Sequence, residues 1–317
     1  MFQGQTLSTL ALLALAGSAP AQTYIAVADS TADAIKLLDP FDGSVVDPAF
    51  IVDAASATTY DFNLPKDVFQ VNNELWVIDQ SADSIFRFDL SGAWVATISP
   101  SVGMLDNIRG GCFANGVVYV TNDGTNNGAT ANSVVMFDPA GNRLGQFISG
   151  PSPFDVVEYN GELLVADFSD SDIRRHDYAG NLLGFFHVSD GITGIDLVEQ
   201  LAVTPAGTVL AAGFQAPQGI YEYDSTGAQI NYYPIAVNMR GVQPLGNGQF
   251  LYSSGALASY DPVLMAITPI DSGGYQFMNY VNLGADPDEF CNGDGGDQMG
   301  CTNCPCGNNS PVGTPGG

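Results

Sequence analysis

Residues 84–92, SIFRFDLSG, return in altered form at residues 133–141, SVVMFDPAG, and at residues 219–227, GIYEYDSTG. In each copy an apolar run ends in an aromatic residue and Asp, and a Gly follows that Asp three positions later. Asp favours the first position of a type I turn, and Gly adopts the left-handed conformation that ends the turn at little cost. The pattern therefore predicts a repeated β-hairpin in which the Asp is a structural residue.

Alignment on this aromatic–Asp signal divides the chain into six units. Their turn residues are Asp39, Asp89, Asp138, Asp177, Asp224 and Asp261. A short β-branched or aromatic run precedes each turn, as in LWVIDQS, and further strands lie before it in units two to six and after it, as in KDVFQVN and AWVATIS. Four strands per repeat of roughly 35–50 residues are typical of the blades of a β-propeller.

The two ends of the repeat region complement each other. The first unit lacks its innermost strand, because Tyr24 already lies in its second strand, whereas a spare strand, YQFMNYVNL at residues 275–283, follows the last unit. We therefore expect an all-β fold: a six-bladed β-propeller over residues 22–284, closed by a C-terminal strand in blade one. Such closure leaves no open blade edge.

The N-terminal residues 1–21 read as a signal peptide. An apolar run from residue 7 to residue 19 is followed by the small-residue cleavage pattern Ala19-Pro20-Ala21, although no Lys or Arg precedes the run. The alternative is a buried N-terminal helix. No other segment approaches the ~20 apolar residues of a membrane-spanning helix. The expectation is an exported protein without a transmembrane segment that is secreted, extracellular or on the cell surface.

The C-terminal residues 285–317 are rich in Cys, Gly and Asp. In an exported chain their cysteines predict two disulfides with three pairings open, and a zinc site is the alternative. These cysteines are Cys291, Cys301, Cys304 and Cys306. Cys112 lies in an innermost strand and is expected to be a buried small hydrophobic residue. The tail resembles a Cys-Pro-Cys-Gly segment that opens a further module in secreted bacterial proteins, and we interpret it as the truncated start of one.

The charge balance narrows the class of partner. The chain has 34 acidic residues, mostly Asp, and only 8 basic ones. Nucleic acid is excluded as a partner, because no basic stripe exists to neutralise phosphates. Asp hydrogen-bonds to nearby backbone and starts turns, so the acidity chiefly reflects the number of turns. The alternative is that Asp-rich loops bind Ca²⁺ through oxygen ligands, for which the loop at residues 123–133 is a candidate.

Two stretches carry a family resemblance. Residues 118–142, VYVTNDGTNNGATANSVVMFDPAGN, resemble a YVTN-type repeat, and residues 160–181, NGELLVADFSDSDIRRHDYAGN, resemble an NHL-type repeat. The resemblance extends over residues 23–283 and is specific for the fold. It implies a site on one face at the central channel, often with Ca²⁺ or a His-bound metal in the enzymes. Such propellers serve as binding scaffolds, surface proteins and occasionally lyases or lactonases.

The chain departs from the enzymes of this group. Its two histidines, His176 and His187, fall in the outer strands of one unit, which argues against a multi-histidine metal centre and Ser-His-Asp chemistry at the channel. No Glu opens an innermost strand, as the Ca²⁺ site of gluconolactonases would require. The leading hypothesis is a non-enzymatic binding or interaction scaffold for a protein or carbohydrate ligand. The alternatives are a channel-mouth lyase or lactonase and a structural module of a larger surface protein.

Polar residues end the second strand in four units, at Asp29, Asp79, Asn122 and Asp167. Because units five and six carry Gly213 and Ser254 instead, these residues are predicted to tether the adjoining loops rather than to bind a metal.

The candidate binding residues start the innermost strands. They are Lys66, Asp67, Arg109, Asp155 and Arg240. Arg109 and Arg240 are three repeats apart and should face each other across a six-bladed ring. One interpretation is that the arginines form ion pairs that hold neighbouring blades together. The other is that both guanidiniums and Lys66 clamp a carboxylate or sulfate, for which Arg offers bidentate geometry.

Overall fold

The computed structural model describes residues 22–53, 59–190 and 192–284. The predicted signal peptide and the predicted disulfides of the C-terminal tail lie outside the described residues and stay predictions. No helix among the described residues is long and apolar enough to cross a membrane.

The described chain is nearly all strand, and four of its sheets are four-stranded and antiparallel. The first contains β4 (Pro65–Val71), β5 (Glu74–Asp79), β6 (Ser84–Asp89) and β7 (Trp94–Ile98). The second contains β8 (Ile108–Ala114), β9 (Val117–Asn122), β10 (Ser133–Phe137) and β11 (Arg143–Ile148). The third contains β12 (Pro153–Tyr159), β13 (Glu162–Asp167), β14 (Ile173–His176) and β15 (Leu182–His187). The fourth contains β16 (Asp196–Val203), β17 (Val209–Gln215), β18 (Gly219–Tyr223) and β19 (Gln229–Pro234).

A fifth sheet has seven strands in the order β20-β21-β22-β23-β1-β2-β3. These strands are β20 (Gly241–Pro244), β21 (Phe250–Ser253), β22 (Gly255–Asp261), β23 (Ala266–Leu283), β1 (Gln22–Asp29), β2 (Ala34–Leu38) and β3 (Val45–Val52). The long β23 pairs with β22 between residues 266 and 275 and has β1 as its other neighbour. The first and last strands of the described chain thus share one sheet.

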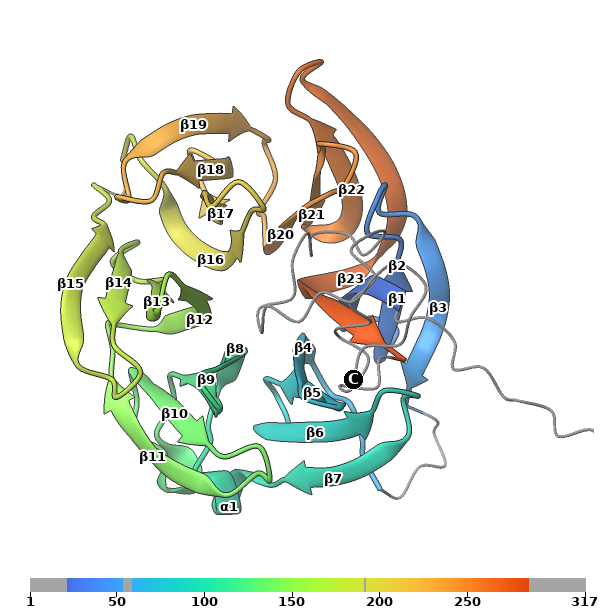
Figure 1. Cartoon of the computed structure of the whole chain (residues 1–317), viewed down its shortest axis with the longest axis vertical. Helices are drawn as coiled ribbons and strands as arrows, with labels where there is room; N and C mark the ends of the chain where they lie inside the picture. Colours follow the sequence, from blue (N-terminus) through green and yellow to red (C-terminus); the bar gives the residue numbers. More distant parts are fainter. Residues whose placement is uncertain (1–21, 54–58, 191, 285–317) are drawn as a thin grey trace, which may run out of the picture. The chain divides into compact units, whose positions relative to one another are not determined.

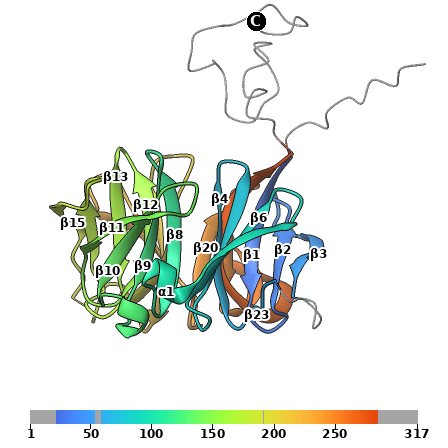
Figure 2. The same ribbon diagram turned by 90° about the horizontal axis from the view of Figure 1, so that it is seen from below.

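The sheets stand around a common centre (Figure 1), and most strands run along the axis of that ring (Figure 2). Only two short helices interrupt the pattern of the described chain, α1 (Pro100–Gly103) and the 3₁₀ turn η1 (Asn126–Gly128). This arrangement of antiparallel sheets is that of a β-propeller.

The repeated Asp–Gly turns form as predicted. In the turn of β6 and β7, the Gly92 amide donates to the Asp89 carbonyl at 3.0 Å, and Gly92 has a φ of 82°. The turns at Gly141, Gly180 and Gly227 have the same hydrogen bond and a positive φ. In the first unit, whose turn has one more residue, the Gly43 amide donates to the Asp39 carbonyl, and Gly43 also has a positive φ. In the sixth unit, which lacks this Gly, the residue with positive φ is Met265.

The hydrophobic core lies between neighbouring sheets. Trp76 from β5 packs edge-on against Phe137 from β10, with ring centroids 6.5 Å apart, and both are fully buried. Similar clusters join each sheet to the next, for example Leu164 of β13 with Tyr221 of β18. Cys112 of β8 lies half-buried beside such a cluster. The sheets are therefore held face to face by apolar side chains, and the polar residues of the innermost strands lie around the centre.

Candidate functional site

The strands that lie nearest the centre of the ring are β4, β8, β12, β16, β20 and β23, and we call them the inner strands (Figure 1). Near the centre, hydrogen bonds of polar side chains link each part of the ring to the next, between sheets and, within the seven-stranded sheet, between β20 and β23. The links join Asp67 to Gly111, Thr121 to Phe154, Asp155 to Leu201, Gln200 to Val242, Gln243 to Met278, and Asn279 to Asp67. Followed around the ring, these links begin at Asp67 and end at Asp67.

Four inner strands contain a bulge at the same level. The pairing with the second strand slips between Pro65 and Asp67, between Ile108 and Gly111, between Pro153 and Asp155, and between Val198 and Leu201. A bulge adds an unpaired residue and redirects its side chain. The residues without a regular partner are Lys66, Arg109, Gly110, Phe154, Glu199 and Gln200. The repeated bulge thus supplies most of the side chains of the channel.

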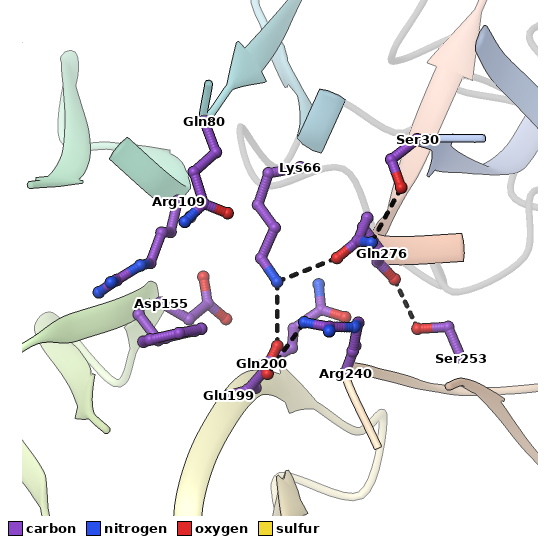
Figure 3. A network of polar contacts seen from close by, with 12 residues as sticks. Ser30, Lys66, Gln80, Arg109, Asp155, Glu199, Gln200, Arg240, Ser253 and Gln276 are labelled. Atoms are coloured by element: carbon purple, nitrogen blue, oxygen red, sulfur yellow. Dashed lines mark hydrogen bonds and ion pairs between the residues drawn. The ribbon is translucent and has the colours of Figure 1, made fainter. Parts of the chain in front are cut away.

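The centre of this level contains a buried ion pair. Lys66 Nζ lies 3.0 Å from Glu199 Oε2, and both side chains are only 1% exposed. Lys66 Nζ also donates to Gln276 Oε1 at 3.1 Å and lies 4.3 Å from the centroid of the Phe277 ring. Burial lowers the pKa of Lys66, and the Glu199 carboxylate opposes this shift. The pair joins β4 to β16, which are three inner strands apart (Figure 3).

The two predicted arginines belong to opposite sides of the ring, one in β8 and one directly before β20, and they bind different carboxylates. Arg240, directly before β20, donates through Nη1 to Glu199 Oε1 at 3.3 Å, and its side chain is 34% exposed. Arg109 of β8 donates to Asp123 Oδ2 at 3.1 Å and to Ser152 Oγ at 2.9 Å. The Arg109 guanidinium points away from the Lys66 ammonium (Figure 3). The structure therefore brings Lys66 and Arg240 together on Glu199 and leaves Arg109 apart.

Asp67 and Asp155 bind backbone amides rather than arginines. Asp67 accepts hydrogen bonds from the amides of Val68 and Gly111 and from Asn279, and Asp155 accepts them from the amides of Val156 and Leu201. Burial raises the pKa of Asp67 to about 7 and that of Asp155 well above its ordinary value. These carboxyls do hold neighbouring sheets together, but through amides that the irregular pairing leaves available.

Above the ion pair, the two arginines are connected by a row of aromatic rings. Arg109 Cζ lies 4.0 Å from the Phe154 centroid, and Phe154 stacks on Phe168 at 4.2 Å. Phe168 lies 6.0 Å from Phe214, above which Arg240 Cζ stands at 5.2 Å. Phe168 and Phe214 are half-exposed. We call these five residues the aromatic–arginine row; it combines ring faces with cations, which attract each other.

The loop-tethering prediction is confirmed at the ends of the second strands. Asp79 accepts hydrogen bonds from the amides of Asn63, Leu64, Ser81 and Ala82, and Asn122 accepts one from the amide of Asp106. Asp29 and Asp167 accept backbone amides and also pair with Lys36 and Arg174, respectively. Among the described residues, no group of three or more His, Cys, Asp or Glu side chains is arranged to hold a metal ion.

The histidines lie away from the inner strands. His176 in β14 contacts the Phe147 ring at 4.9 Å and the Gly180 carbonyl at 3.2 Å. His187 in β15 contacts the Tyr223 ring at 4.4 Å and the Gly227 carbonyl at 3.1 Å. Both therefore belong to the packing between outer strands, as the sequence indicates.

The sequence patterns missed Glu199, Phe168 and Phe214. The two phenylalanines could have been found, because each directly follows the residue at the matched end of a second strand, Asp167 or Gly213. Glu199 follows an irregular stretch of β16 in which Leu197 has a φ of 51° and the pairing with β17 slips. The residue types in that stretch do not indicate which side chain points into the channel.

The sequence matches no known family model, and no curated protein matches it. Solved structures are similar in fold. A chain of the nidogen/laminin complex is 12% identical with a TM-score of 0.63, over 82% of this chain and 98% of that one. A protein of unknown function from Bacteroides caccae is 14% identical with a TM-score of 0.58, over 82% and 98%. Catalytically inactive virginiamycin B lyase from Staphylococcus aureus, with quinupristin, is 12% identical with a TM-score of 0.55, over 83% and 92%. These likenesses support a β-propeller fold.

Proposed function

We propose that residues 23–283 form a six-bladed propeller closed by β23, and that the protein is an exported, non-enzymatic scaffold that binds ligand at the channel mouth. The count of six blades is supported by the seven-stranded sheet, whose two halves can each be assigned to a separate blade. Ile25 and Val27 of β1 pack with Leu251 of β21 and Leu257 of β22 in one buried cluster. Two halves that share a core are better described as two neighbouring blades, with β23 as the outer strand of one and the inner strand of the other.

The observation that carries the binding proposal is the buried pair of Lys66 and Glu199 beneath the aromatic–arginine row. The pair and Gln276 occupy the channel at the level of the bulges, so the mouth has a filled floor. Above that floor, half-exposed Phe168, Phe214 and Arg240 remain accessible. A closed platform of ring faces with one accessible guanidinium suits recognition of a ligand surface. The fold likeness to a lyase concerns the architecture alone.

The accessible groups define a ligand chemistry. Among the described residues Arg240 makes one ion pair, at 3.3 Å, so its guanidinium retains donors for a carboxylate. Phe214 lies directly beneath it and offers a flat apolar face. A ligand with a carboxylate on a ring, such as a uronic acid in a polysaccharide, satisfies both groups. A net charge of −26 opposes anions at long range, so such binding depends on these local contacts.

This proposal is tested with oligogalacturonate as the probe, measured by isothermal titration calorimetry. We expect the parent to bind and Arg240→Gln to bind at least tenfold more weakly, because the substitution removes the accessible cation. Arg143→Gln on the outer strand β11 is the charge-matched control and should bind like the parent. Binding that survives Arg240→Gln and Phe214→Ala, no binding by the parent, or cleavage of the bound oligosaccharide would contradict the proposal.

A further inference from the structure

A cavity of about 390 Å³ lies between the β12–β15 sheet and the turn at residues 224–227, and none of the residues that line it belongs to the aromatic–arginine row. Its floor contains Tyr159, Leu164 and Phe186, all buried. Its rim contains Asn160, Ser225 and Thr226, all exposed. The ion pair of Glu162 and Arg175 completes the lining. We call this cavity the rim groove. Its volume falls in the range of about 300–1,000 Å³ that is common for small-molecule sites.

The β4–β7 sheet shows how the repeat fills the matching place. There Trp76 pairs with Arg87, as Leu164 pairs with Arg175 in the β12–β15 sheet. Arg87 binds Glu74 through Nε and Nη2, with Nε 2.8 Å from Oε2, and stands 5.0 Å above the buried Trp76 ring. Its Nη1 and Nη2 donate to the carbonyls of Ala140 and Pro139 in the turn of the next sheet. An indole and two carbonyls therefore occupy this place.

The rim groove lacks these occupants. Leu164 stands where the indole stands in the other sheet, and its smaller side chain leaves the space above it empty. Arg175 still binds Glu162 through Nε and Nη2, at 2.7 and 2.6 Å. No described residue accepts a hydrogen bond from Arg175 Nη1, and its side chain is 41% exposed, against 10% for Arg87. The groove thus has open space beside the position that an indole fills in the other sheet, and a donor without an acceptor among the described residues.

The polar groups of the rim indicate what kind of ring fits. Among the described residues, the side-chain amide of Asn160 and the side-chain hydroxyl of Ser225 have no hydrogen-bond partner. The groove therefore offers both donors and acceptors. Glu162 already neutralises Arg175, and the chain carries a net charge of −26, so an anionic ring is disfavoured. Tyr159 and Phe186 supply aromatic surface for an apolar ring face. A neutral ring with several hydroxyl groups meets all of these conditions.

We infer that the rim groove is a second binding site, independent of the channel mouth, and that it takes a neutral pyranose sugar. One face of the ring packs on Tyr159, Leu164 and Phe186. A ring hydroxyl accepts from Arg175 Nη1, in the role that the Ala140 carbonyl has for Arg87. Asn160 and Ser225 bind further hydroxyls at the rim. Because the rim is exposed, the sugar can be either a free monosaccharide or the end of a chain.

The test uses methyl glycosides of glucose, galactose and mannose, followed by ligand-observed NMR. We expect the parent to bind at least one of them and Leu164→Trp to bind at least tenfold more weakly, since the indole occupies the groove as it does in the β4–β7 sheet. Arg240→Gln, at the channel mouth, is the control and should bind like the parent. A trisaccharide of the bound sugar distinguishes chain ends from free sugars by its higher affinity.

A second measurement does not depend on the folding of a variant. In the parent, the bound glycoside should shift the resonances of Leu164, Phe186 and Tyr159 and leave those of Phe168 and Phe214 unchanged. Absence of binding by all three glycosides, shifts confined to the channel mouth, or undiminished binding by a folded Leu164→Trp variant would overturn the inference. None of these results bears on the uronate proposal, which has its own probe and variant.

Discussion

At the residue scale, the centre of the molecule depends on opposite charges that are fully desolvated. Removing two ions from water is costly, and the attraction between Lys66 and Glu199 offsets that cost only because both stay bonded. Gln276 and Arg240 occupy further hydrogen-bonding positions of the pair. Loss of one partner would leave the other charge buried with too few neighbours.

Lys66→Met is therefore expected to lower the free energy of unfolding by about 3–5 kcal/mol, the range for breaking one partner of a buried ion pair. Urea unfolding followed by circular dichroism measures the change. The control is Arg175→Met, which breaks a half-exposed pair and should cost about 0–1 kcal/mol. The double variant Lys66→Met with Glu199→Leu should recover much of the loss, because it removes both charges. Strictly additive losses would show that the two residues do not interact across the ring.

The location of individual site residues could be predicted from the sequence, but their binding partners could not. The structure places Lys66, Asp67, Arg109, Asp155 and Arg240 at or directly before the starts of inner strands, as the alignment of repeats predicts. Their partners could not be derived from the alignment. A bulge decides whether a side chain meets a neighbouring strand or an opposite one, and its position depends on tertiary pairing.

At the element scale, the turns follow from short-range chemistry and were predictable for that reason. An Asp that binds the amides after it and a Gly with positive φ form the hairpin with few distant contacts, as Asp89 and Gly92 show. Strand positions follow equally directly from β-branched and aromatic runs. The inner strands are harder to predict from the sequence, because their bulged residues interrupt the alternation of apolar and polar residues that is typical of a strand.

The turn glycines nevertheless differ in their surroundings, which gives a prediction. Gly227 and Gly161 have nearly equal φ values of 84° and 85°. A Cβ on Gly227 would overlap the carbonyl oxygen of Phe186, whereas a Cβ on Gly161 would meet nothing within 4 Å. Gly161→Ala should therefore cost only the backbone strain of about 1–2 kcal/mol. Gly227→Ala should cost clearly more, measured by chemical denaturation; equal losses would show that the turn does not pack against β15.

Across the whole molecule, most basic residues form ion pairs with acidic residues of the same chain. Seven of the eight basic residues form an ion pair within the described chain. The surplus acidic residues include the turn residues Asp89, Asp138, Asp177 and Asp224, whose hydrogen bonds lower their pKa values and keep them charged. The acidity therefore arises largely from the repeated turn, and binding depends on local sites rather than on the overall charge.

The proposed closure of the ring by β23 is the feature on which the proposed six-bladed fold depends. Residues 275–283 contribute four side chains that are fully buried, Tyr275, Phe277, Met278 and Val281. Burial of each such side chain is worth about 1.5–3 kcal/mol, so their sum is comparable to the roughly 5–15 kcal/mol of a typical domain. Gln276 and Asn279 add bonds to Lys66 and Asp67.

The most direct measurement compares the thermal unfolding of a chain that ends after residue 272 with that of one that ends after residue 285. If β23 closes a six-bladed ring, the shorter chain loses the inner strand beside β1 and the links to β4. It should then melt at a much lower temperature and with less cooperativity, or not fold. Melting at the same temperature and with the same cooperativity as the longer chain would contradict the closed ring.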